Sequence, residues 1–143
     1  VSMRESVRAA ISSGMPTLAE CGGFMYLHNR IEDMNSKMYE MVGIIDGEVY
    51  RTPKLKRFGY ITASSKVDGV CGPAGTVYQA HEFHYFESTS CGEGYHAQKP
   101  GSKRGWECTH VSENLQAGFP HMYYYSNIPA TAEFVKRCAM FGA

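Results

Sequence analysis

Cys21 stands in a setting that suits a nucleophile. It lies within the sequence AECGG, residues 19–23, at the end of the short apolar run over residues 15–20. The spacing matches the nucleophile elbow G-x-S-x-G, with Cys in place of Ser and Ala in place of the first Gly. A nucleophile between a strand and a helix needs a sharp turn, and small neighbours let that turn close. On these residues alone, a structural cysteine buried in a tight turn is the competing interpretation.

Such an elbow would assist the Cys21 thiol in two ways. The helix that follows would direct its N-terminal amides at the sulfur and favour the thiolate. The amide of Gly22 would face the oxyanion that forms when the sulfur attacks a carbonyl group. We therefore expect Cys21 to be the one unusually reactive thiol of the five in the chain.

A thiol nucleophile also needs a base, and histidine is the usual one. His28 follows Cys21 too closely along the elbow helix to be a natural partner. His121 begins a predicted strand after the sequence GFP, but its position alone does not single it out from a structural histidine. The remaining histidines are placed by pattern in surface regions or on alternate faces of a strand: His81, His84, His96 and His110.

Composition excludes several classes of function. The 143 residues suffice for one domain, 43% are hydrophobic, and Lys plus Arg balance Asp plus Glu at 14 each. The chain therefore has no positive excess for nucleic acid or an anionic membrane, and no apolar run of membrane-spanning length. Without a C-x-x-C pair we expect no metal site, and without an export signal we expect reduced thiols in a cytoplasmic protein.

The hydrophobic pattern predicts an α/β domain. A helix over residues 2–13, a buried strand over 15–20 and a second helix over 24–28 indicate a parallel sheet with covering helices. The middle of the chain is rich in β-branched and aromatic residues, and the end reads as a helix that admits Pro129 in its first turn. Strands are predicted at 42–50, 58–65, 77–86, 95–98, 106–111, 115–119 and 121–126, and the final helix at 128–140.

Four segments together resemble the glutamine amidotransferase domain of cobyrinic acid a,c-diamide synthases. They are PTLAECGGFMYL at 16–27, RFGY at 57–60, HEFHY at 81–85 and GFPHMYYYSN at 118–127. The resemblance implies a three-layer, flavodoxin-like class I amidotransferase fold over residues 1–143, truncated at its N-terminus. It also implies that Cys21 attacks the side-chain amide of glutamine, that Gly22 helps to hold the oxyanion, and that His121 is the base.

Two positions depart from the pattern that the resemblance implies. Many class I amidotransferases carry an acid two residues after the catalytic His, and here that position is Tyr123. The site is then a Cys–His dyad or takes its third member from elsewhere, with Glu82 as a candidate and Glu82 or His84 as groups that orient substrate. The second departure is small, because Ala80 replaces a Gly before HEFHY.

The resemblance implies partners that this sequence does not contain. In the family, a synthetase domain uses ATP and Mg²⁺ to activate the a and c carboxylates of a corrinoid precursor in cobalamin biosynthesis, and the enzyme is a ligase. No phosphate-binding G-x-x-x-x-G-K-[ST] sequence occurs here. We expect this chain alone to hydrolyse glutamine weakly and to associate with itself or with a synthetase domain. Hydrogenobyrinic acid or nickel sirohydrochlorin as acceptor, a non-catalytic docking fragment, and another cysteine hydrolase remain alternatives.

Overall fold

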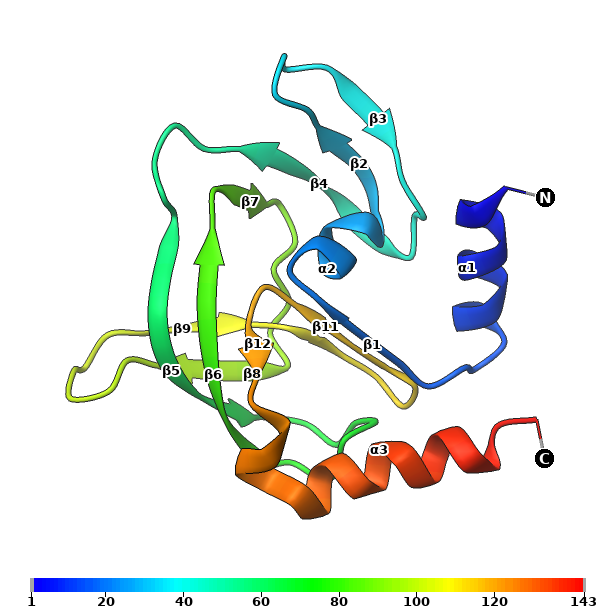
Figure 1. Ribbon diagram of the computed structural model, residues 1–143, viewed down its shortest axis with the longest axis vertical. Helices are drawn as coiled ribbons and strands as arrows, with labels where there is room; N and C mark the ends of the chain where they lie inside the picture. The colour runs from blue at the N-terminus through cyan, green and yellow to red at the C-terminus, as the bar shows by residue number, and fades with distance from the viewer. Residues whose placement is uncertain (1, 143) are drawn as a thin grey trace.

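The computed structural model describes residues 2–142 and begins with helix α1 (Met3–Ser12). Ser2 and Glu5 start the helix as a capping box, in which each side chain accepts a hydrogen bond from the other residue's amide. Ile11 is buried, and the chain turns back at Gly14, whose φ of 95° suits glycine. The helix therefore presents an apolar side to the molecule and delivers the chain to the first strand (Figure 1).

A small sheet carries the elbow. Strand β1 (Thr17–Glu20) pairs in parallel with β11 (Leu115–Gly118), which pairs antiparallel with β10 (His110–Val111), so the strand order is β1-β11-β10. Helix α2 (Gly22–Tyr26) follows β1 after a single residue. Phe24 at the centre of α2 is fully buried and its ring packs edge-on against Phe119, at 4.9 Å between centroids. This contact fixes α2 to the chain that leaves β11.

A five-stranded antiparallel sheet lies beside the elbow sheet. Its order is β12-β6-β5-β8-β9, and β5 and β6 form its longest pair (Figure 1). Its core includes fully buried Ile61, Ala63 and Tyr78. The strands are β5 (Arg57–Ser65), β6 (Val77–His84), β8 (Tyr95–Gln98), β9 (Gly105–Cys108) and β12 (His121–Met122).

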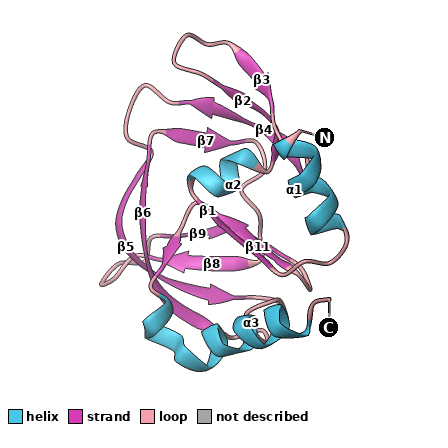
Figure 2. Ribbon diagram, turned by 45° about the vertical axis from the view of Figure 1, so that its right-hand side comes forward, coloured by secondary structure: helices cyan, strands magenta, loops and turns pink. Residues whose placement is uncertain are grey.

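A third sheet has the order β3-β2-β4-β7, and α2 lies between it and the elbow sheet (Figure 2). Strands β2 and β4 pair in parallel, and the other two pairings are antiparallel. Val49 in β4 is fully buried and Ile45 nearly so. The strands are β2 (His28–Glu32), β3 (Met38–Glu40), β4 (Ile45–Arg51) and β7 (Phe86–Ser88).

The chain ends in a 3₁₀ turn, η1 (Tyr124–Asn127), and helix α3 (Ile128–Met140). The Asn127 side chain caps α3 by accepting a hydrogen bond from the amide of Ala130 at 3.2 Å, and Pro129 occupies the first turn. None of the helices within residues 2–142 is both long and apolar enough to cross a membrane.

The architecture is a mixed α/β fold with several sheets and few helices. The predicted helix at 128–140 and strand at 95–98 are confirmed to the residue. Three predictions are wrong: His28 begins β2 instead of ending a helix, the strand predicted at 121–126 ends at Met122, and the strand predicted at 106–111 is divided between β9 and β10. After Met122 the chain bends into η1, because Ser126 Oγ accepts from the amide of Gln79 in β6 and so ends the ladder.

Gly118 at the end of β11 should be irreplaceable for packing. A Cβ at this position would lie 2.4 Å from Thr109 Oγ1 and 3.0 Å from its Cα, and Thr109 is only 1% exposed, so it has no room to withdraw. We expect Gly118→Ala to lower the free energy of unfolding by about 1–3 kcal/mol, measured by urea denaturation. Gly23→Ala is the matched control, because its Cβ would meet Ala19 Cβ at an ordinary 3.7 Å. Equal losses in the two variants would contradict this reading of Gly118.

Candidate active site

Cys21 forms the strand-to-helix turn that the sequence predicts. Strand β1 ends at Glu20 and α2 begins at Gly22, which leaves Cys21 alone at the corner. Its φ of 46° and ψ of −105° lie in a region that residues other than glycine rarely adopt. The Cys21 amide donates to Gly118 O at 2.9 Å, and its carbonyl oxygen accepts from the Met25 amide at 2.9 Å. The strained corner is therefore fixed to the end of β11 on one side and to α2 on the other.

The environment of the Cys21 thiol corrects the expectation that the helix after Cys21 favours the thiolate. The Gly22 amide does face the sulfur and lowers the pKa of the thiol, as predicted, but burial raises that pKa more. The carboxylates of Glu20 and Glu82 raise it further. Helix α2 has only five residues, so its dipole is too small to overcome burial and two negative charges. Cys21 therefore rests as a neutral thiol and not as a preformed thiolate.

His121 lies at the carboxyl end of the strand next to β1. It follows β11 after two residues and begins β12, where it pairs with His81 of β6. Its side chain is 47% exposed, and its Nδ1 is 3.8 Å from Glu20 Oε2. Because Glu20 directly precedes Cys21, the structure gathers the predicted nucleophile and the predicted base around one carboxylate.

Sequence reasoning missed Glu20. Its Oε1 accepts hydrogen bonds from the Met122 amide at 3.1 Å and from the Tyr124 hydroxyl at 2.5 Å. Burial first, and then the Glu20 carboxylate, raise the pKa of Tyr124, so its hydroxyl stays protonated and donates. One signal was available in the sequence: Glu20 is an acid next to a candidate nucleophile, at the end of a predicted strand and after the small apolar residue Ala19.

Glu82 and His84 project into the interior from β6. Glu82 is 2% exposed, its Oε2 lies 3.9 Å from Arg57 Nε, and burial raises its pKa to about 7 although Arg57 opposes the shift. His84 Nδ1 pairs with Phe86 O at 2.7 Å, and its ring stacks on Phe119 at 3.9 Å between centroids. Burial lowers the pKa of His84.

The structure does not place Glu82 or His84 in contact with His121, the predicted base. Within residues 2–142, neither Glu82 nor His84 makes a hydrogen bond or ion pair with His121. Residues directly opposite in a sheet share a face, so His121 lies on the face of its partner His81, and Glu82, the next residue in β6, points to the other face. His84 instead stacks on Phe119, which lies two residues before His121 in the chain.

The other histidines have structural partners. His28 is fully buried, with Nε2 2.7 Å from Ser88 Oγ. His110 Nε2 pairs with Ser90 O at 2.8 Å, and His96 Nδ1 lies 2.9 Å from Glu107 Oε1 at the surface. His81 packs edge-on against Tyr60, at 5.4 Å between ring centroids. Of the histidines within residues 2–142, His121 is the one whose ring lies near the carboxylate of Glu20, the residue before Cys21.

A hollow of about 390 Å³ opens beside His121. Its lining comes from β5, β6, β12 and the residue after β12, and it includes Tyr60, His81 and Tyr123, but not Cys21. Tyr123 occupies the position where the resemblance leads one to expect an acid, and its side chain is 62% exposed. The hollow therefore reaches the site at His121 and provides an aromatic wall there.

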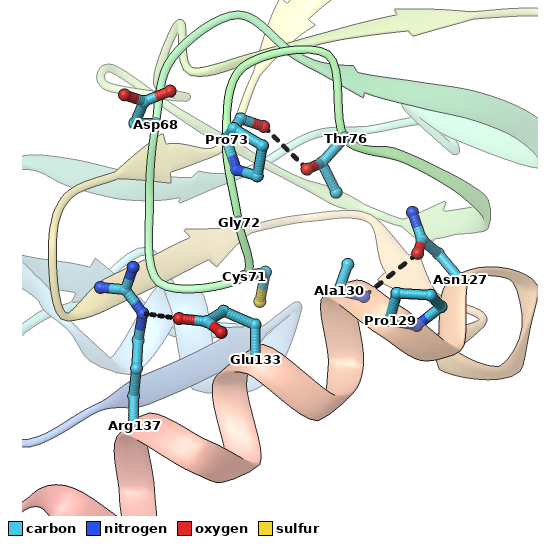
Figure 3. A pocket seen from close by; sticks show the side chains of 10 residues that line it. All are labelled: Asp68, Cys71, Gly72, Pro73, Thr76, Asn127, Pro129, Ala130, Glu133 and Arg137. Carbon is cyan, nitrogen blue, oxygen red and sulfur yellow. Dashed lines mark hydrogen bonds and ion pairs between the residues drawn. The ribbon is translucent and has the colours of Figure 1, made fainter.

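A second cavity, of about 530 Å³, lies elsewhere, between α3 and the loop that holds Cys71 (Figure 3). Its walls include the Glu133–Arg137 ion pair, at 3.2 Å, and the cap of α3 at Asn127. None of the predicted site residues lines this cavity, and burial raises the pKa of the Cys71 thiol to about 11. The cavity is thus separate from the site at Cys21. Within residues 2–142 no cluster of three or more His, Cys, Asp or Glu side chains is arranged to hold a metal ion.

Comparison with known proteins agrees with this geometry. Residues 1–127 match the model of the CobB/CobQ-like glutamine amidotransferase domain. A cobyrinate a,c-diamide synthase of Caldanaerobacter subterraneus subsp. tengcongensis is 41% identical over 99% of this chain, and that match covers 32% of the relative. Proteins of the same name from Listeria monocytogenes and Priestia megaterium are 39% and 37% identical over 89% and 96% of the chain, covering 29% and 30% of each relative. The chain thus spans about a third of the length of these curated relatives, and it belongs to the CobB/CobQ-like glutamine amidotransferase domain family.

Proposed function

We propose that this chain is the glutamine-hydrolysing part of a cobyrinate a,c-diamide synthase. The observation that carries the proposal is the corner at the ends of β1 and β11, where the strained Cys21 is hydrogen-bonded to Gly118 and His121 follows three residues later. Family membership supports glutamine as the substrate, and the names of the relatives support the synthase.

The proposed chemistry of hydrolysis assigns a role to each of three groups. Cys21 Sγ attacks the carboxamide carbon of glutamine while His121 takes the thiol proton, and the Gly22 amide donates to the oxyanion. The tetrahedral intermediate collapses, the C–N bond breaks, and His121 returns the proton to the departing ammonia. Water, activated by the same imidazole, then hydrolyses the glutamyl thioester to glutamate and restores the thiol. Because Cys21 rests as a thiol, a base is needed at the moment of attack.

The larger assembly is part of the proposal. The relatives are about three times as long as this chain, which supports a synthetase domain that uses ATP and Mg²⁺ to activate the a and c carboxylates of a corrinoid precursor in the cytoplasm. Residues 1–143 would form the C-terminal part of a flavodoxin-like, three-layer amidotransferase domain. The acceptor would be a cobyrinic acid, with hydrogenobyrinic acid and nickel sirohydrochlorin as the alternatives.

An aromatic face on β5 and β6 supports association. Phe58, Tyr60, Phe83 and Tyr85 are 62%, 75%, 47% and 47% exposed, and Phe58 lies directly opposite Phe83 in the ladder. Exposed aromatic side chains gathered on one face are typical of contact surfaces. We propose that this aromatic face contacts a second copy of the chain.

Cys21 should react before every other thiol with a glutamine-mimicking diazo-ketone amino acid. Cys138 is the control, because it is exposed but lies on α3 away from the site. Half-buried Cys91 and buried Cys108, whose pKa values burial raises to about 12, should not react. Mass-spectrometric mapping after brief treatment measures the order. His121→Ala should slow Cys21 labelling markedly, and Cys21→Ser should lower glutamine hydrolysis by at least about 10³-fold. Labelling of Cys138 as fast as Cys21 would exclude the proposed nucleophile.

The pH dependence of simple alkylation should show the raised pKa of Cys21. The neutral thiol dominates below the pKa, which burial holds above the ordinary value of 9.0. The rate with iodoacetamide should therefore rise about tenfold per pH unit between pH 7 and 9. The Cys138→Ser variant is the protein to use, since it removes the exposed thiol. A rate that reaches its plateau below pH 8 would contradict the pKa shift.

Light scattering should show that the chain self-associates and that Phe58→Ser combined with Tyr60→Ser weakens the association. Removing two exposed rings deletes apolar contact area without disturbing the core on the other side of β5. Tyr39→Ser is the matched control, because Tyr39 is 42% exposed on β3, in a different sheet. The same molar mass for all three proteins at high concentration would rule out the aromatic face as a contact surface.

A further inference from the structure

Glu20 makes an unusual set of contacts for a residue next to a nucleophile. Its carboxylate links the end of β1 to β12 and η1. Oε1 accepts hydrogen bonds from the Met122 amide and the Tyr124 hydroxyl, and Oε2 lies toward His121 Nδ1. The side chain is 25% exposed, so water screens it only in part. Two hydrogen bonds on one oxygen fix the carboxylate and leave the other oxygen available to the imidazole.

A carboxylate beside Nδ1 decides which nitrogen of a histidine carries the proton. When Nδ1–H points to an acid, Nε2 keeps its lone pair and is the nitrogen that can accept a proton from a nucleophile. The separation of 3.8 Å is an ion-pair distance and not a hydrogen bond, and such contacts commonly tighten when substrate binds. The positive charge that His121 acquires during attack would strengthen the contact.

Two other candidates for this role are placed elsewhere. Tyr123, at the position of the expected acid, is exposed and offers a phenol and no carboxylate. Glu82 is buried beside Arg57 on the face of β6 that His121 does not share. Among the acids within residues 2–142, Glu20 is the one whose carboxylate reaches the imidazole of His121.

We propose that Glu20 is the positioning residue of the site: it orients His121 with Nδ1–H toward its carboxylate and Nε2 free for the Cys21 thiol, and it stabilises the imidazolium formed during attack. The role in hydrolysis rests on the proposed function, whereas the choice of tautomer rests on the Glu20–His121 contact alone. The nucleophile and the group that orients its base are then consecutive residues, Glu20 on β1 and Cys21 at the corner.

Glu20→Gln tests the proposal directly. The amide oxygen can still accept from Met122 and Tyr124, but an amide N–H then faces His121 Nδ1 and favours the tautomer with the proton on Nε2. We expect kcat for glutamine hydrolysis by the full chain to fall on the order of 10²-fold or more, with KM changed less than about twofold, because in the proposal Glu20 acts through His121 and not on glutamine. Tyr124→Phe, which removes one anchor and keeps the carboxylate, should lose less.

A spectroscopic measurement separates orientation from folding. In ¹⁵N-histidine NMR spectra, assigned with His121→Ala, the His121 signals should move from the Nδ1–H to the Nε2–H pattern in Glu20→Gln. Glu107→Gln is the matched control, since it breaks another carboxylate–histidine contact, the one with His96. It should change the His96 signals and leave both kcat and the His121 signals as they are in the unaltered chain.

The outcomes distinguish the two proposals. Wild-type kcat and an unchanged His121 tautomer in folded Glu20→Gln would overturn the role of Glu20. If Cys21→Ser and the unaltered chain hydrolyse glutamine equally, the proposed function fails, and the NMR comparison still decides whether Glu20 orients His121. If Glu20→Gln does not fold, the same spectra of Glu20→Asp decide, because the shorter side chain withdraws the carboxylate from His121 Nδ1: a His121 tautomer population identical to wild type would count against the proposal.

Discussion

The parallel pairing of β1 with β11 is the constraint on which the site depends. It aligns Glu20 with Gly118, so the two strands end at the same level and their next residues emerge together. The hydrogen bond from the Cys21 amide to Gly118 O extends this ladder by one step and fixes the corner. Segments about a hundred residues apart in the chain thus meet at one sheet edge, which is where parallel α/β sheets commonly place reactive groups. Without this register, neither Cys21 nor His121 would have a defined place.

Close packing around that sheet edge holds the end of β11 and the start of β12 rigidly in place. Phe119 lies between Phe24 of α2 and the stacked ring of His84, so the chain entering β12 is clamped from two sides. Thr109, which has a φ of 66°, presses against the Gly118 backbone and leaves no space for a Cβ. Close packing of this kind resists small displacements. Functional side chains must keep their positions to within about 0.5 Å, and rigid packing of this kind provides that precision.

Local signals predicted the parts of the fold that local interactions decide. The elbow at Cys21 follows from small residues between a strand and a helix, and α3 follows from a helical segment that admits Pro129 in its first turn. The neighbours of His28 favour a helix, yet His28 begins β2, where its ring reaches Ser88, sixty residues away. Glu20 was missed for the same reason: its partners in β12 and η1 lie more than a hundred residues further along the chain. Propensity and spacing cannot report such partners, and the resemblance that indicates His121 as the base says nothing of its contact with Glu20.

The raised pKa of Cys21 has a consequence for the lifetime of the protein. Peroxide oxidises thiolates far faster than thiols, and sulfinic and sulfonic acids form from cysteines that rest in the charged state. If Cys21 is the nucleophile, burial and the neighbouring carboxylates keep it neutral and protected while idle, and it is vulnerable only during the brief interval in which a base holds its proton. The same desolvation that slows spontaneous ionisation thus gives the residue chemical durability between turnovers.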